Sequence, residues 1–196
     1  MIRRLIITFV VRLIGLIQRD IAIYLPKFGH LLSFETILFF LRISEGETIK
    51  GILRFYGATI GENVRISAPL IIHNANGSFA NLRIEDNCHI GRDVFLDLAD
   101  TITIERNVTI SMRCTILTHF DAGDSHIGQF GYKRSQAPVL IKGGAYLGCG
   151  VTILAASTVG QSALVAAAAV VHGEIPPSVL AAGVPARIVK TLSEQS

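Results

Sequence analysis

Among the six histidines of the chain, His119 has the position best suited to acid–base chemistry. An imidazole exchanges a proton near neutral pH, so histidine is the side chain most often used as a general base. A solvated or structural role is the ordinary one for a lone histidine, and position is what distinguishes this one. His119 stands where a regular repeat stops and a nineteen-residue insertion at 120–138 begins. Long loops on rigid scaffolds often carry function, so His119 is the histidine to consider first for acid–base chemistry, and His126, within the insertion, is the second.

The repeat that surrounds His119 has a period of six residues, which neither a helix nor a simple alternating strand produces. Such a period is typical of a parallel β-helix, in which three hexapeptides form one coil. Ordinary amphipathic strands, the alternative, would show apolar spacings of two and turn clusters every eight to twelve residues. The apolar anchors are Ile60, Ile66, Ile72, Ile84, Ile90, Leu96, Ile104, Ile110, Ile116, Ile141, Leu147, Ile153, Val159, Val165 and Val171. We therefore predict a mainly β fold, a solenoid with a protruding loop, in which Pro176 and Pro177 end the repeat.

The phase of the repeat predicts which residues lie beside His119. The spacing between Leu96 and Ile104 is eight residues instead of six, so two extra residues must bulge from the coil there. Three hexapeptides per coil place Leu96 directly under Ile116, and the bulge at 96–101 then lies one coil beneath His119. Its acids, Asp97 and Asp100, could orient the imidazole or hold substrate hydroxyls, or they could be turn acids that satisfy local backbone donors. Asp121, two residues beyond His119, is a further candidate for the same roles.

Composition places the chain among globular proteins of one domain. It has 196 residues, is 50% apolar, and carries a net charge of +3 without a basic run with interleaved aromatics, so we predict no nucleic-acid binding. The three cysteines are an odd number without metal-ligand spacing, and no metal site is predicted. The phase puts Cys88 and Cys114 inward on different faces, where a disulfide between them is not expected. Buried free thiols suit a reducing compartment, and we predict a cytoplasmic protein.

Residues 1–45 precede the repeat and are strongly apolar, with Arg4, Arg12 and Arg19 on one side of a predicted helix. Arg12 makes the apolar run too short to span a bilayer, and no cleavage site of a signal peptide follows it. A second apolar stretch runs from Pro26 to about Leu41. These segments could cap the open first coil, or residues 1–20 could make a peripheral contact with the inner face of a membrane. The predicted division is an N-terminal helical segment at 1–45, a repeat domain at 46–192 and a tail at 193–196.

Three segments of the chain resemble the hexapeptide-repeat acyltransferases, and within them the sugar O-acetyltransferases. The segments are I-L-T-H-F-D at 116–121, V-L-I-K-G-G-A-Y-L-G-C-G-V-T-I-L at 139–154 and E-I-P-P-S-V-L-A-A-G-V-P-A-R-I-V-K at 174–190. The resemblance covers about residues 50–192 and implies a left-handed helix, a homotrimer, acetyl-CoA as donor and His119 as the catalytic base. It also implies direct transfer to a sugar hydroxyl, as in the synthesis of bacterial surface polysaccharides. Several galactoside and maltose enzymes of this family carry asparagines in the segment before the histidine, where regular hexapeptides are predicted here.

The resemblance also assigns residues that would bind the donor. Cys149 and Ala167 match positions beside the pantetheine arm, and Gly148 and Ala166 match positions where backbone approaches closely. Arg187 and Lys190 match the cations near the CoA phosphates, a role that suits their charge, although a solvated C-terminal segment is the alternative.

Other functions compatible with this repeat are acetylation of a drug or another small molecule, a metal enzyme of the γ-type carbonic anhydrase kind, and a non-catalytic solenoid. The chain lacks the long helical N-terminal domain of serine acetyltransferases, which argues against that branch. A carbonic anhydrase needs three converging histidines, and the phase puts His89 and His119 on different faces. Loss of CoA release on mutation of His119 would separate an enzyme from a silent solenoid.

Overall fold

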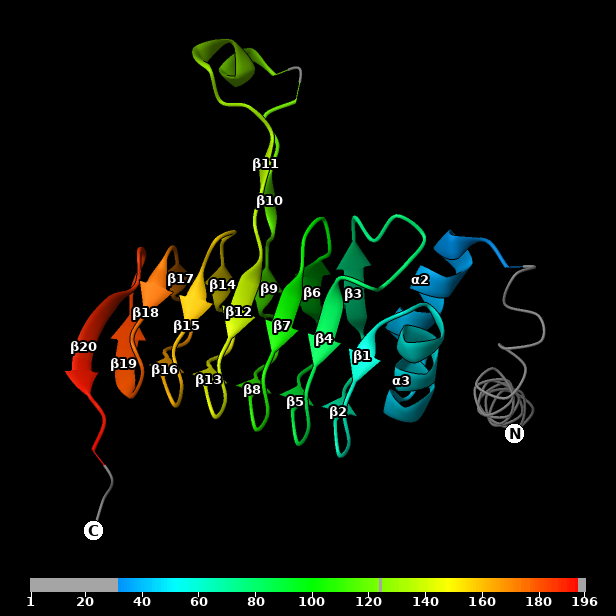
Figure 1. Ribbon diagram of the computed structural model, residues 1–196, viewed down its shortest axis with the longest axis horizontal. Coiled ribbons are helices and arrows are strands. Elements are labelled where there is room, and N and C mark those ends of the chain that lie inside the picture. The colour runs from blue at the N-terminus through cyan, green and yellow to red at the C-terminus, as the bar shows by residue number, and fades with distance from the viewer. Residues whose placement is uncertain (1–31, 124, 194–196) are drawn as a thin grey trace, which may run out of the picture.

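A β-solenoid of about six coils makes up most of the protein (Figure 1). The computed structural model describes residues 32–123 and 125–193. Short parallel strands stack on three faces, and each strand lies one ladder spacing, about 4.8 Å, from the equivalent strand of the next coil. The predicted mainly β fold is therefore confirmed.

Among the described residues the first face has six strands, and in the first five coils the chain passes from it to the second face and then to the third. The strands of the first face are β1 (Thr59–Ile60), β4 (Leu82–Ile84), β7 (Ile102–Ile104), β12 (Val139–Ile141), β15 (Thr158–Val159) and β18 (Glu174–Ile175). The second face contains β2 (Arg65–Ile66), β5 (His89–Ile90), β8 (Thr109–Ile110), β13 (Tyr146–Leu147), β16 (Leu164–Val165), β19 (Val179–Ala182) and β20 (Arg187–Thr191). The third face contains β3 (Leu70–His73), β6 (Val94–Asp97), β9 (Thr115–Ile116), β14 (Thr152–Ile153) and β17 (Val170–Val171).

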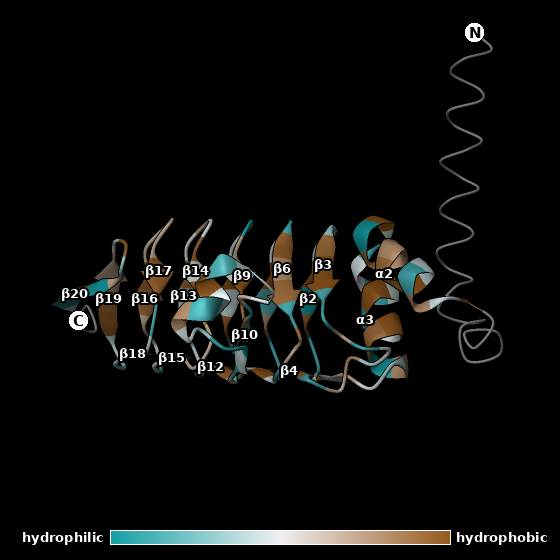
Figure 2. Cartoon of the chain, turned by 90° about the horizontal axis from the view of Figure 1, so that it is seen from above, coloured by the Kyte–Doolittle hydropathy of each residue, from teal (hydrophilic) through white to brown (hydrophobic). Residues whose placement is uncertain are grey.

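The core is the stack of anchors that the six-residue period predicted, and each of them is buried. Ile84 pairs in register with Ile104, and Leu96 pairs with Ile116, as the phase required. The eight-residue spacing after Leu96 is therefore absorbed in a turn, and the register of the faces is kept. Figure 2 shows the apolar strands along the length of the solenoid.

The turns between the first and second faces show why the sequence closes into coils. One residue of each turn has a left-handed backbone, with φ between 53° and 72°: Asn63, Asn87, Asn107, Gly144, Ser162 and Ser178. Asparagine and glycine adopt this conformation at the lowest cost, and they supply four of these six positions.

The two inward cysteines are buried free thiols, as expected, whereas Cys149 is exposed. Cys88 Sγ lies 3.0 Å from the carbonyl oxygen of Glu105, and Cys114 Sγ lies 3.1 Å from that of Gly148. Burial raises the pKa of Cys88, and it raises the pKa of Cys114 to about 11. Both groups therefore act as small apolar core residues.

Helices α2 (Phe34–Ile43) and α3 (Gly46–Phe55) close the open first coil. Ser33 caps α2 by accepting a hydrogen bond from the Thr36 N–H, and both helices bury an apolar side against the solenoid. The buried side chains are Ile37, Leu41, Ile49, Ile52 and Leu53. The predicted capping role holds for the described part of the second apolar stretch, from residue 32 on. The predicted boundary at 45 and 46 falls between the two helices.

The predicted helix with Arg4, Arg12 and Arg19 lies outside the described residues. Within residues 32–123 and 125–193, no helix has the length and apolar character needed to cross a bilayer.

The prediction that Pro176 and Pro177 end the repeat is wrong. They occupy the turn after β18, and β19 continues the second face with Leu180 in register with Leu164. A turn needs no ladder donor from these residues, so proline fits there. Strand β20 then pairs antiparallel with β19 and ends the stack.

The insertion at 120–138 leaves the solenoid as an arm (Figure 1). Strands β10 (His119–Phe120) and β11 (Ser135–Gln136) pair antiparallel at its base, with His119 opposite Gln136. A 3₁₀ helix, His126–Phe130, lies near its tip. The base of the arm therefore holds the backbone of His119 directly.

Candidate functional site

Three polar side chains from three successive coils meet where the third face ends. Asn74 follows β3, Asp97 ends β6 and His119 begins β10 just after β9. Because β3, β6 and β9 are stacked in register, the residues that follow them gather at one edge of the prism. We call this line of turns between the third and first faces the histidine edge.

Asp97 and His119 form the centre of this group. The Oδ2 atom of Asp97 lies 2.5 Å from Nδ1 of His119, a short hydrogen bond. The same Oδ2 accepts the Thr118 N–H at 2.9 Å, and Oδ1 accepts from Asn74 Nδ2 at 2.6 Å. The side chain of Asp97 is 1% exposed, whereas that of His119 is 25% exposed. The carboxylate is thus enclosed, while the imidazole reaches the surface.

These contacts determine the tautomer of His119. A carboxylate accepts hydrogen bonds only, so Nδ1 must carry the proton that points to Asp97. In the neutral ring Nε2 is then unprotonated and free to accept a proton. The contact of Asn74 Nδ2 with Nδ1, at 3.4 Å, joins two donors and is a close approach.

The environment of Asp97 favours its charged form. Burial alone raises the pKa of this carboxyl, but the hydrogen bonds from His119, Asn74 and the Thr118 N–H together hold its pKa below the usual 3.8. A carboxylate that stays ionised beside the ring stabilises the imidazolium that forms when His119 takes up a proton. The pair therefore has the chemistry of a general base and its orienting group.

His119 opens onto a groove of about 590 Å³ along the histidine edge. Its floor is apolar, with Leu154, Ala155 and Ala156 from the following coil, and Phe120 and Tyr132 come from the arm. The rings of Phe120 and Tyr132 meet edge to face at 6.4 Å. His172 lines the same groove one coil further on, because β17 stacks on β14.

The other predicted carboxylates do not touch the imidazole. Oδ1 of Asp100 accepts the N–H of Thr101 at 2.6 Å, and the Asp100 N–H donates to Thr118 Oγ1 at 2.9 Å. Asp100 thus serves the local backbone, which is the turn role weighed from the sequence. It also holds Thr118, whose neighbour is His119.

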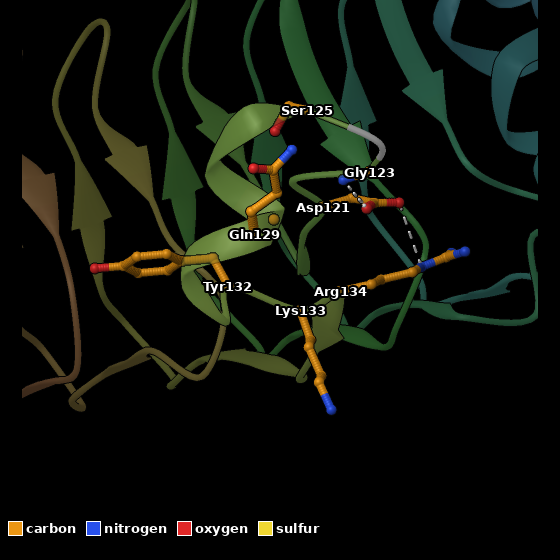
Figure 3. Close-up of a pocket in the computed structure, with 8 residues that line it drawn as sticks. Asp121, Gly123, Ser125, Gln129, Tyr132, Lys133 and Arg134 are labelled. Carbon is orange, nitrogen blue, oxygen red and sulfur yellow. Dashed lines mark hydrogen bonds and ion pairs between the residues drawn. The ribbon is translucent and has the colours of Figure 1, made fainter.

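Asp121 belongs to the arm and lines a separate hollow of about 580 Å³ there (Figure 3). Its Oδ1 accepts the Gly123 N–H at 2.7 Å, and its Oδ2 lies 3.8 Å from Nε of Arg134. His126 is exposed on the 3₁₀ helix and packs against Phe130. Neither residue contacts His119 in the described part of the chain.

The candidate donor residues lie together on another edge of the prism. Gly148 and Cys149, and then Ala166 and Ala167, form turns between the second and third faces in successive coils. Arg187 begins β20, at the C-terminal end of this line of turns, and Lys190 lies on β20 opposite Leu180. We call the line of turns 148–150, 166–168 and 183–186 the alanine edge. Within one chain the whole third face separates it from the histidine edge.

Close packing between coils explains part of the small-residue pattern on the alanine edge. A Cβ atom on Gly148 would lie 2.5 Å from the backbone nitrogen of Ala167, so this glycine is required by the next coil itself. The N–H groups of Ala166 and Ala168 donate to the carbonyls of Ala181 and Cys149. The Ala167 N–H has no acceptor among the described residues.

The sequence interpretation missed Asn74. It expected regular hexapeptides before His119, but residues 74–81 form an irregular loop between β3 and β4, and Ser78 marks it in the sequence. The broken anchor at Ser78 and the asparagines at 74 and 76 were the available signals.

His89 lies on β5 of the second face, away from His119, as the phase predicted. Among residues 32–123 and 125–193, no group of three or more histidine, cysteine, aspartate or glutamate side chains could hold a metal ion.

Comparison with known proteins finds relatives among the acetyltransferases. No protein-family model matches the chain. Galactoside O-acetyltransferase of Escherichia coli (strain K12) is 27% identical over 158 residues, which are 78% of this chain and 72% of that protein. The matches to the next two curated relatives cover 55% and 44% of those proteins, so the chain spans about half the length of each.

Solved structures show the same solenoid. A hexapeptide-repeat acetyltransferase from Vibrio cholerae O1 biovar eltor, complexed with acetyl coenzyme A, aligns with a TM-score of 0.70 at 24% identity over 82% of this chain and 85% of that one. A galactoside acetyltransferase in complex with coenzyme A aligns with a TM-score of 0.64 at 25% identity over 81% and 78%. The relatives found by sequence and by structure are thus hexapeptide-repeat acetyltransferases and galactoside O-acetyltransferases. The predicted acyltransferase class is thereby confirmed. The acceptor and the catalytic base of this acetyltransferase are the subject of the proposal below.

Proposed function

We propose that this acetyltransferase moves the acetyl group of acetyl-CoA to a hydroxyl group of a sugar, with His119 as the general base. The observation that carries the proposal is the Asp97–His119 pair, whose free ring nitrogen opens onto a groove. The galactoside enzyme whose structure contains coenzyme A supports the choice of donor, and its name supports a sugar acceptor.

The chemistry follows from the tautomer. Nε2 of His119 accepts the proton of the acceptor hydroxyl as that oxygen attacks the thioester carbonyl. The carbon–sulfur bond then breaks, the acetyl ester remains on the acceptor, and the departing thiolate takes the proton from the imidazolium. Asp97 stabilises the imidazolium during both steps, so no acyl-enzyme is needed.

The donor would lie along the alanine edge. The Ala167 N–H, which has no acceptor among the described residues, would donate to an amide oxygen of the pantetheine arm, and the small side chains of Cys149 and Ala166 would leave room beside it. Arg187 and Lys190 would face the phosphates of CoA. Asp121 and Asp100 are proposed only as contacts for the acceptor or its surroundings, because neither touches His119.

A complete site then requires a second copy of the chain. The histidine edge and the alanine edge lie on opposite sides of the third face, so one subunit would supply the base and its neighbour the donor edge. We propose a homotrimer with three such shared sites, since closed symmetry gives every subunit the same two contacts. The arm at 120–138 would reach the neighbour.

The open groove on the outside of the solenoid can admit one end of a long molecule. This supports a glycan acceptor of the kind used in surface polysaccharides. A lipid-linked glycan would be met at the cytoplasmic face of the membrane, where residues 1–20 are proposed to make a peripheral contact.

The test is the activity of His119→Ala with acetyl-CoA and a panel of sugar, nucleotide-sugar and small-molecule acceptors. Loss of a general base typically lowers the rate by about 10²–10⁴, so we expect at least a hundredfold loss with an intact fold. His126→Ala is the matched control and should keep wild-type turnover. Near-wild-type activity of His119→Ala would disprove the proposed base, and transfer only to non-sugar acceptors would disprove the proposed substrate class.

A further inference from the structure

The loop 74–81 connects the first coil to the second and places an amide against the buried carboxylate. Asn74 Nδ2 donates to Asp97 Oδ1 at 2.6 Å. Among the described residues, this amide is the one hydrogen-bond donor to that oxygen. The other oxygen, Oδ2, is shared by His119 and the Thr118 N–H. Removal of the Asn74 amide would therefore leave one oxygen of an enclosed charged group without a donor.

The backbone at Asn74 is suited to hold this amide. Its φ is 55°, in the left-handed region, where asparagine is tolerated better than most residues. The loop on either side is fixed, because Ala75 and Phe79 are buried and the Phe79 N–H donates to the carbonyl of Tyr56 at 2.7 Å. At its far end Asn81 Nδ2 donates to the carbonyl of Leu98 at 3.0 Å. The amide is thus positioned by packing against the helical cap and the next coil.

The contact also affects which tautomer of His119 is stable. With Nδ1 unprotonated, Asn74 could donate its second hydrogen to that nitrogen across the present 3.4 Å, and Asp97 Oδ2 would face a lone pair. The charged carboxylate excludes that arrangement as long as it remains in place. Its place is secured from the opposite side by Asn74.

We infer that Asn74 is a positioning residue of the acetyltransferase, which holds Asp97 against His119 and so keeps the Nε2 atom of His119 unprotonated for its role as base. This inference rests on the proposed function of His119. Asn74 acts through Asp97 and touches no reacting atom, so its loss should lower kcat and leave both KM values nearly unchanged.

The experiment compares Asn74→Gly with Asn76→Gly. Glycine keeps the left-handed backbone at either position, so the first variant removes the amide without adding strain. Asn76 has a φ of 47° in the same loop and is exposed, which makes it the matched control. Hydrogen bonds to charged groups contribute about 1.5–3 kcal/mol, so kcat of Asn74→Gly should fall roughly ten- to a hundredfold, whereas Asn76→Gly should match the wild type. Asn74→Ser, whose side chain is too short to reach Oδ1, should behave like Asn74→Gly.

A double-mutant cycle distinguishes positioning from general loosening of the fold. In an Asp97→Asn background the further change Asn74→Gly should have almost no effect on kcat, because the two residues act in series. The ¹⁵N shifts of the His119 ring should report the Nδ1–H tautomer in the wild type and a mixture in Asn74→Gly. Additive losses in the cycle, or an unchanged tautomer together with wild-type kcat, would overturn the inference. If His119→Ala is inactive while Asn74→Gly is fully active, the proposed function stands and this inference alone fails.

Discussion

His119 and Asp97 lie 22 residues apart in the chain, yet Nδ1 of one is 2.5 Å from Oδ2 of the other. The solenoid brings them together because one coil of stacked strands separates them. Asp97 ends β6 and His119 follows β9, and these two strands pair in register on the third face. A rigid stack therefore holds the proton-accepting group and its counter-charge without the help of a second subunit.

Replacement of Asp97 by asparagine should reduce stability in a pH-dependent way. The folded pKa of Asp97 is lowered, so its contribution is present above the unfolded value near 4 and is lost as pH falls through the folded value. An amide at position 97 would also point a donor at the donors of Asn74, Thr118 or His119, at a cost of about 1–3 kcal/mol. Urea denaturation should show a deficit at pH 7 that narrows below about pH 4. An equal deficit at pH 3 and pH 7 would contradict the assigned charge.

Mixed oligomers should reveal whether the site is shared. His119→Ala removes the base, and Ala167→Phe would block the alanine edge, so each variant alone should be inactive. Co-assembled subunits would form some sites with an intact base and an intact donor edge, and activity should return to a measurable fraction of the wild-type value. No recovery in verified mixed trimers, or a fully active monomer in light scattering, would place both halves in one chain.

Charge reversal at the C-terminal end should affect the donor more than the acceptor. Arg187→Glu with Lys190→Glu should raise KM for acetyl-CoA at least about tenfold, since charge-assisted contacts with phosphates are strong. Arg65→Glu with Arg83→Glu changes the net charge equally at exposed positions on the early coils and is the control. If the two double variants have the same KM for acetyl-CoA, Arg187 and Lys190 are simply solvated.

The position of His172 in the groove predicts that this second histidine contributes to acceptor binding. His172 lines the same groove as His119 from the far side of Leu154 and Ala156, where it can donate to or accept from an acceptor hydroxyl. His172→Ala should raise KM for the acceptor about tenfold, the value of one hydrogen bond of roughly 1.4 kcal/mol, with little change in KM for acetyl-CoA. The same variant with an unchanged acceptor KM would remove this part of the groove from the acceptor site.

The arginines of the N-terminal segment predict binding to anionic lipid. Each could add about 1 kcal/mol near a negatively charged leaflet. Intact protein should float with anionic liposomes, and the variant with Arg4, Arg12 and Arg19 changed to glutamate should not. If the intact protein remains at the bottom of the gradient, the proposed membrane contact is wrong.

The sequence alone was sufficient for the solenoid because its evidence is local and repeated. A six-residue period survives single exceptions, and the register of Ile84 with Ile104 and of Leu96 with Ile116 follows from counting. The same counting placed Asp97 beneath His119. Counting did not find the two ends of the repeat, because neither end is marked by a periodic feature. Pro176 and Pro177 fit into a turn inside the repeat, and α3 covers the first coil.

Contacts that depend on side-chain direction were decided only by the tertiary structure. Counting could not separate Asp97 from Asp100, because both belong to one bulge, and the direction of each carboxylate depends on the backbone donors near it. Asn74 could not be placed by counting, because its loop has no period. Its amide reaches Asp97 because Ala75 is buried and Phe79 packs against Phe34 of α2. The period thus determined which coil each residue occupies, while packing in the irregular turns determined which of them touch.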